Sequence, residues 1–147
     1  MKIHQILSKP KLGMKNNQDS VGVSKKKSGI WVIDGITEIS PIQLTSGSKS
    51  VSWFVNQLSE YLTQYLDQID FTITEILVNA VKKIRKEFKA LKPSNIDLSN
   101  LYEQPSASII VARNNQDKGQ ELFSLGDCVA YLHSSNQEYL IQNEELK

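Results

Sequence analysis

The sequence predicts an α+β fold in which an antiparallel helix pair packs on antiparallel β-sheet. Three observations support this prediction. Apolar residues favour strands in residues 20–35, follow a helical period between residues 49 and 92, and alternate again after Pro105. The order is therefore strands, two helices, strands, which is typical of α+β folds rather than of regularly alternating α/β folds.

The length and composition favour one globular domain over residues 1–147. Seventeen Lys and Arg nearly balance sixteen Asp and Glu, so no global field attracts nucleic acid or an anionic membrane. The single Cys128 excludes an internal disulfide, and His4 and His133 lack zinc-finger spacing. No stretch has the length of a membrane helix and residues 1–7 lack a signal-peptide core, so the expected location is cytoplasmic.

The first predicted hairpin sets two aspartates at one edge of a sheet. A strand around Val21 is followed by a Lys-rich turn and by the continuous apolar run Ile30–Ile33. In an antiparallel pair the start of one strand lies beside the end of the next, so Asp19 and Asp34 should meet and outline a cation site. Gln-Asp-Ser and Asp-Gly are also common turn sequences, so a purely structural interpretation stays open.

The segments around this hairpin are predicted from composition. A short strand over residues 2–7 is expected before a loop that carries Lys9, Lys11 and Lys15. These lysines could hold a phosphate beside the carboxylates, although lysines in loops are usually only solvated. The stretch 36–49 is rich in Ser, Thr, Pro and Gly and is predicted to be a long exposed loop.

Two amphipathic helices are predicted from apolar spacing. The first, over residues 49–68, has an apolar stripe formed by Val51, Phe54, Val55, Leu58, Tyr61, Leu62, Tyr65 and Leu66. The second begins with the capping box of Thr72 and Glu75 and ends before Pro93. Its predicted buried face comprises Ile73, Leu77, Ala80, Val81, Ile84, Phe88 and Leu91. No aromatic residues interleave with the basic residues on its other face, so we interpret that face as solvated rather than as a nucleic-acid site.

Strands return after the helices. The alternation predicts strands over residues 106–113, 121–125 and 129–133, and a further one over residues 139–141. A polar turn is expected from Asn114 to Gly119, and the tight bend Gly126-Asp127 adds another carboxylate.

Four motifs, in order, resemble the metal-dependent protein phosphatases of the 2C type. They are Asn17-Gln18-Asp19, Trp31-Val32-Ile33-Asp34-Gly35, Pro105-Ser106-Ala107-Ser108-Ile109-Ile110-Val111 and Leu125-Gly126-Asp127-Cys128-Val129-Ala130-Tyr131-Leu132. The resemblance implies part of an α-β-β-α sandwich of two antiparallel sheets flanked by helix pairs. It also implies hydrolysis of phosphoserine and phosphothreonine by a water that bridges two Mg²⁺ or Mn²⁺ ions.

The same resemblance implies roles for individual residues. Asp34 would bridge both ions, Gly35 would offer its backbone carbonyl, and Asp19 with Gln18 would orient bound waters. Asp127 matches the aspartate that holds a third ion in bacterial members. The family's phosphate-gripping arginine falls on Met14, which leaves Lys15 or Lys11 as substitutes without the bidentate fork of Arg.

The resemblance covers only the first part of the family's fold. The aspartates that complete its first metal site would come from motifs beyond Lys147, so the domain is expected to be truncated. One hypothesis is a phosphatase acting on phosphoproteins, and the alternative is a truncated or degenerate pseudophosphatase that acts as a binding module. An unrelated α+β binding module is a third possibility. Missing strands would leave sheet edges open, which predicts self-association.

Overall fold

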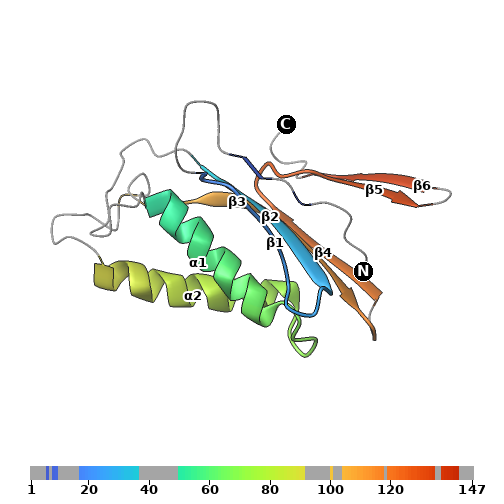
Figure 1. Ribbon diagram of the computed structural model, residues 1–147, viewed down its shortest axis with the longest axis horizontal. Coiled ribbons are helices and arrows are strands. Elements are labelled where there is room, and N and C mark those ends of the chain that lie inside the picture. Colours follow the sequence, from blue (N-terminus) through green and yellow to red (C-terminus); the bar gives the residue numbers. More distant parts are fainter. Residues whose placement is uncertain are drawn as a thin grey trace.

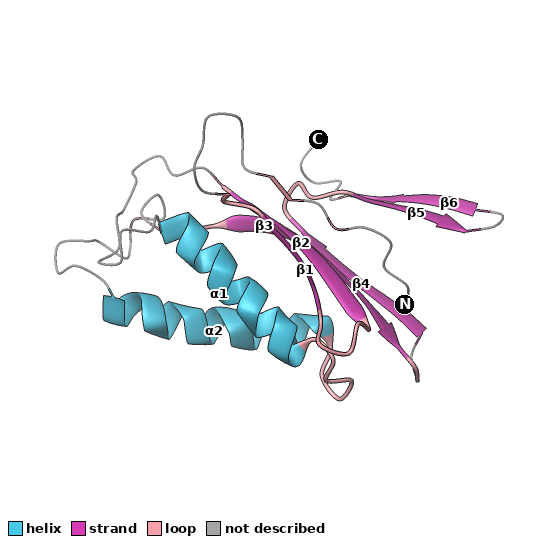
Figure 2. Cartoon of the chain, viewed as in Figure 1, coloured by secondary structure: helices cyan, strands magenta, loops and turns pink. Residues whose placement is uncertain are grey.

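The computed structural model describes residues 6, 8–9, 17–36, 50–91, 100, 104–117, 119–134 and 137–142. Figure 1 and Figure 2 show a helix pair on one side of a four-stranded sheet and a separate two-stranded hairpin on the other side. The predicted α+β class is confirmed. The strand expected over residues 2–7 and the loop expected over residues 36–49 lie largely outside the described residues.

The larger sheet is antiparallel throughout and has the order β1-β2-β3-β4. Strands β1 (Ser20–Val23) and β2 (Gly29–Gly35) form the predicted first hairpin. After the helices, β3 (Ala107–Asn115) pairs with β2 and with β4 (Gly119–Leu125). The turn between β3 and β4 is shorter than predicted because the buried Asn115 still pairs with Gly119 and extends the ladder.

The last two strands form a sheet of their own. Strand β5 (Ala130–Ser134) pairs antiparallel with β6 (Gln137–Ile141), and the two correspond to the strands predicted over residues 129–133 and 139–141. In Figure 1 this hairpin lies on the side of the larger sheet that faces away from the helices. Its apolar side chains are mostly exposed, including Tyr131 at 61% and Leu140 at 60%.

The helices α1 (Ser50–Tyr65) and α2 (Ile73–Leu91) match the two predicted amphipathic segments. The capping box is formed: the Thr72 amide donates to the Glu75 carboxylate at 2.8 Å, and the Glu75 amide donates to Thr72 Oγ1 at 3.2 Å. Helix α1 ends three residues before the predicted end, because the backbone loosens into a turn in which the Gln68 amide donates to the Tyr65 carbonyl at 3.0 Å.

The core lies between the helices and one face of the larger sheet. Its buried members include Trp31, Ile33, Ile109 and Val111 from the sheet and Val51, Val55, Leu58, Leu62, Ile73, Ile76, Leu77, Ala80 and Ile84 from the helices. The run Ile30–Ile33, although continuous in the sequence, alternates between the two faces, so Val32 is 45% exposed on the face away from the helices.

Two residues of the predicted face of α2 are not buried. Val81 is 47% exposed and Leu91 is 39% exposed, whereas Ile76, which the prediction omitted, is buried. The buried stripe runs along Ile73, Ile76, Ala80, Ile84 and Phe88, which leaves Val81 on its margin. Leu91 is the final residue of the helix, almost one turn beyond Phe88.

Arg113 occupies a core position at the end of β3 and is only 2% exposed. Its Nε and Nη2 both donate to the carboxylate of Glu121, the residue opposite it on β4. Nη1 donates to the carbonyls of Leu66 at 3.2 Å and Gln68 at 2.8 Å, and Nη2 donates to that of Phe71 at 2.8 Å. The guanidinium is therefore fully bonded, and it ties the connection between α1 and α2 to the sheet.

Asp67 holds the same connection to the Lys-rich turn between β1 and β2. Its carboxylate accepts from the Lys26 amide at 2.7 Å and from the Ser28 hydroxyl. Partial burial by itself raises the pKa of this carboxyl, but hydrogen bonds from Ser24, Ser28 and Lys26 outweigh that effect and hold the pKa below its ordinary value. The corner formed by residues 66–71 is thus fastened to the sheet by two charged side chains.

Candidate functional site

The register of the first hairpin brings Asp19 and Asp34 together. Ser20 opposes Ile33, so Asp19, just before β1, and Asp34, in β2, occupy the next position of the same ladder. Both side chains are exposed. Because Ile33 faces the helices, the alternation along β2 directs Asp34 to the opposite face of the sheet.

Ser108 connects Asp34 with the third predicted aspartate. It opposes Asp34 in the ladder between β2 and β3, and its hydroxyl accepts a 3.3 Å hydrogen bond from the Asp127 amide. Gly126 makes this approach possible, since its φ is +84° and a Cβ there would lie 2.3 Å from Ser108 Oγ. The bend after β4 therefore places Asp127 at the same edge as Asp34.

Cys128 lies within the electrostatic reach of all three aspartates. Burial is the main cause that raises the pKa of its thiol, and the negative charges of Asp34, Asp127 and Asp19 raise it further, against a backbone hydrogen bond from Asp34. The half-buried Cys128 side chain thus interacts with carboxylates from three separate segments. We call this arrangement of Asp19, Asp34 and Asp127 the carboxylate edge.

Gly35, the predicted backbone ligand, is buried at the end of β2. A Cβ at this position would lie 2.4 Å from the carbonyl oxygen of Gln18 and 2.6 Å from Val51 Cγ1. Only glycine permits this contact, which places the backbone of residues 18 and 35 side by side next to the two aspartates.

The carboxylate edge has the donor chemistry of a site for a hard cation, since carboxylate and carbonyl oxygens are the ligands that Mg²⁺ and Mn²⁺ prefer. Among the residues that the structure describes, however, no three His, Cys, Asp or Glu side chains are grouped so that they could hold a metal ion. The described residues therefore fit such an ion in the kind of ligand but not in the number. The predicted phosphate contacts Lys11 and Lys15 lie outside the described residues.

The sequence profile of the protein phosphatase 2C family matches residues 13–145. The chain belongs to the protein phosphatase 2C family. The resemblance seen in the four motifs is thereby confirmed, and members of this family generally use Mg²⁺ or Mn²⁺ and act on phosphoproteins.

A solved structure shares the fold. It is the crystal structure of the PPM Ser-Thr phosphatase MsPP from Mycobacterium smegmatis in complex with cacodylate, which is 15% identical with a TM-score of 0.50. The alignment covers 88% of this chain and 47% of that chain, so this chain spans about half the length of MsPP. The predicted partial 2C-type sandwich is confirmed at the level of the fold. No curated protein matches the chain, and no described helix is long and apolar enough to cross a membrane.

Two residues of this site were not singled out by sequence reasoning. Each was only part of a motif, and Cys128 was otherwise considered as an unpaired cysteine. Strand alternation could have identified Ser108. It lies with Ile110 on the face of β3 that points away from the helices, which is the face that carries Asp34 on β2. The position of Cys128 follows from the turn at Gly126, which the strand pattern alone does not fix.

Proposed function

We propose that this 2C-family chain contributes the first part of a metal-dependent serine/threonine phosphatase site, and that it acts on phosphoproteins in the cytoplasm. The observation that carries the proposal is the carboxylate edge. Asp19, Asp34 and Asp127 come from three separate segments, yet the register of β1, β2 and β3 and the hydrogen bond between the Asp127 amide and Ser108 bring them to one edge of the sheet. Packing alone gives no reason to gather three exposed carboxylates, because like charges repel one another at such an edge.

Each residue has a role in the proposal. Asp34 and the Gly35 carbonyl would hold the divalent ions, Asp19 with Gln18 would orient the waters around them, and Asp127 would hold a further ion. When bound, Mg²⁺ or Mn²⁺ would supply a hydroxide-like nucleophile near neutral pH and offset the charge of the phosphate. Lys11 and Lys15 would contact the phosphate, each as a single point charge.

A non-catalytic role is the second candidate, and a specific observation favours it. Among the residues that the structure describes, no three His, Cys, Asp or Glu side chains are grouped so that they could hold a metal ion. In that case the chain is a pseudophosphatase that binds a phosphorylated or other partner segment without turnover.

A Mn²⁺ titration by calorimetry, combined with hydrolysis of para-nitrophenyl phosphate, separates the two candidates. The chain is compared with Asp34→Ala and with the control Asp117→Ala, which changes an exposed aspartate in the turn between β3 and β4. The phosphatase proposal expects Mn²⁺ binding and Mn²⁺-dependent turnover, both lost in Asp34→Ala and retained in Asp117→Ala. Binding without turnover would favour the pseudophosphatase, and no difference between the two variants would remove the carboxylate edge as a metal site.

A further inference from the structure

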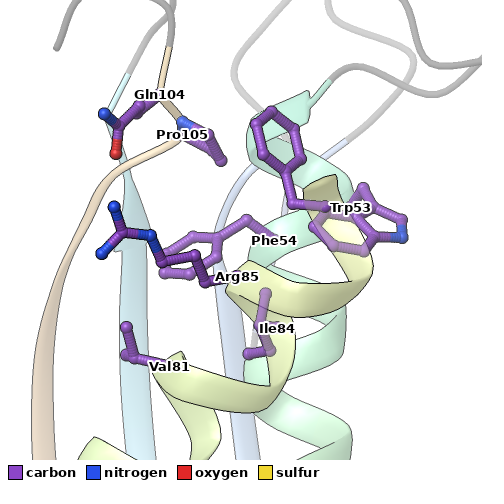
Figure 3. A pocket seen from close by; sticks show the side chains of 8 residues that line it. Trp53, Phe54, Val81, Ile84, Arg85, Gln104 and Pro105 are labelled. Atoms are coloured by element: carbon purple, nitrogen blue, oxygen red, sulfur yellow. The ribbon is translucent and has the colours of Figure 1, made fainter. Parts of the chain in front are cut away.

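An apolar groove runs along one flank of α2, on the helix side of the larger sheet. It consists of two adjoining hollows of about 180 and 330 Å³ that share Phe54 and Val81. The first is bounded by Phe88 and by Pro105, and Figure 3 shows Arg85 reaching from α2 toward Gln104 and Pro105 beside Phe54. The second continues toward Leu125 at the end of β4. We call these two hollows together the α2 groove.

The wall of the α2 groove exposes large apolar side chains to solvent. Val78, Val81 and Leu125 line it and are 45%, 47% and 56% exposed. Such residues usually mark a contact surface when they are contiguous, whereas isolated exposed apolar residues need no explanation. These three line one hollow together with Phe123 and Leu77.

Two cations border the same groove. Lys82 lines the larger hollow and Arg85 lines the smaller one. Neither forms an ion pair with any residue in the described part of the chain, where the pairs are Lys83 with Glu87, Arg113 with Glu121 and His133 with Glu138. The groove is thus apolar inside and positively charged on the α2 rim.

The opposite wall of the groove belongs to an edge strand. Strand β4 pairs with β3 on one side and with no other described strand on its second side. Its free edge presents backbone N–H and C=O groups that an extended chain could pair with. An added strand would direct every second side chain to the helix side, where Phe123 and Leu125 line the groove.

We propose that the α2 groove binds an extended segment of another protein that combines apolar and acidic residues. Its backbone would pair with the free edge of β4, its apolar side chains would fill the hollows, and its carboxylates would face Lys82 and Arg85. This inference does not rest on the proposed phosphatase site, because Asp34 lies on the opposite face of the sheet.

A second copy of this chain is a poorer occupant of the groove. Symmetric pairing of two β4 strands would bring two α2 helices to the same junction, each with its own Lys82 and Arg85. The cations of one copy would then face those of the other, and like charges at an interface are unfavourable. The charge of the rim therefore selects an acidic partner.

The proposal is tested by fluorescence anisotropy with a labelled, capped eight-residue peptide, Leu-Thr-Glu-Thr-Leu-Thr-Glu-Thr, whose leucines and glutamates all point to the same side of an extended strand. We expect saturable binding that is at least about tenfold weaker for the same peptide with lysine in place of glutamate. Lys82→Glu combined with Arg85→Glu should weaken binding at least about tenfold. The matched control, Lys86→Glu with Lys89→Glu, reverses two exposed charges of α2 outside the groove and should change it less than about twofold.

Val81→Asp tests the apolar part of the groove. The side chain is already 47% exposed, so the fold should persist, which circular dichroism and the melting temperature would verify. Binding of the glutamate peptide should fall at least about tenfold. Absence of saturable binding, or equal loss in the groove variants and in the Lys86 and Lys89 control, would overturn the proposal. A dimer in sedimentation velocity that Val81→Asp dissolves would also overturn it, because the occupant would then be a second copy.

Discussion

Arg113 is a charged residue at the end of an otherwise apolar pattern. The alternation Ile109, Val111, Arg113 places it on the helix face of β3, where a cation is tolerated only because every N–H of the guanidinium finds an acceptor. The strand period predicts the buried position from the sequence. The acceptors come from the connection between the helices, and that meeting of distant segments is a property of the fold.

Arg113→Met is expected to lower the free energy of unfolding by about 3–5 kcal/mol, because it leaves the Glu121 carboxylate and three carbonyls without their donor. Urea denaturation followed by circular dichroism measures the loss. Arg85→Met, which removes an exposed arginine of α2, is the matched control and should change the free energy by less than about 0.5 kcal/mol. Equal effects for the two variants would contradict the structural role of Arg113.

Gly126→Ala is expected to be more destabilising than Gly119→Ala. Both glycines have positive φ, +84° and +82°, so both substitutions introduce backbone strain of about 1–2 kcal/mol. Only the Cβ at residue 126 meets other atoms, since it would lie 2.3 Å from Ser108 Oγ, whereas nothing lies within 4 Å at residue 119. Chemical denaturation of both variants measures the difference in the free energy of unfolding. Equal losses would show that contact between the added Cβ at residue 126 and Ser108 costs no additional stability.

At the scale of elements, local signals determined most of what could be predicted. The capping box of Thr72 and Glu75 sets the start of α2 in the sequence and is formed in the structure. The exposed position of Val81 was not predictable, because α1 and the sheet decide which flank of α2 is covered. The edge shared by Asp19 and Asp34 followed from hairpin geometry, whereas the arrival of Asp127 depends on the pairing of β3 with both β2 and β4.

Asp67 should make the stability of the fold sensitive to acid. Its pKa in the folded state lies below the ordinary value of 3.8, so its stabilising effect is present above that pH and is lost as the pH falls through the lower, folded-state pKa. Asp67→Asn should therefore lower the free energy of unfolding at pH 7 by about 1 kcal/mol and flatten its dependence on pH below about 4. Urea titrations between pH 2 and pH 7 test this.

Asp70→Asn is the control for this measurement, because Asp70 is an exposed aspartate of the same connection for which the structure shows no hydrogen bond to the described residues. It should change the free energy of unfolding at pH 7 by less than about 0.5 kcal/mol. A profile of Asp67→Asn as steep as that of the unaltered chain would contradict the stabilisation assigned to Asp67.

At the scale of the whole molecule, the second sheet leaves large apolar side chains exposed to solvent. A two-stranded hairpin is marginally stable alone, and β5 with β6 leaves Tyr131 and Leu140 exposed at directly opposing positions. The self-association predicted from open sheet edges therefore stays a prediction, and this hairpin is where we expect it.

Sedimentation velocity should show a mass that rises with protein concentration. Tyr131→Lys combined with Leu140→Glu replaces the opposing apolar pair by an opposing charged pair, which keeps a favourable cross-strand contact and should abolish the association. Val81→Asp, on the other side of the sheet, should leave the mass unchanged. A monomer at every concentration, or a loss of association in Val81→Asp, would contradict this prediction.

The two fastenings at residues 66–71 have a mechanical consequence. Arg113 and Asp67 join the helix layer to the sheet at one corner, where α1 ends and α2 begins, so we expect that corner to move least. The opposite ends of the helices, near Ser50 and Leu91, lie farthest along α1 and α2 from this corner. Amide hydrogen exchange should therefore be slowest in residues 62–66 and become faster along α1 toward its first turn. This pattern is expected if the helices tilt about the corner at residues 66–71 while they stay packed on the sheet.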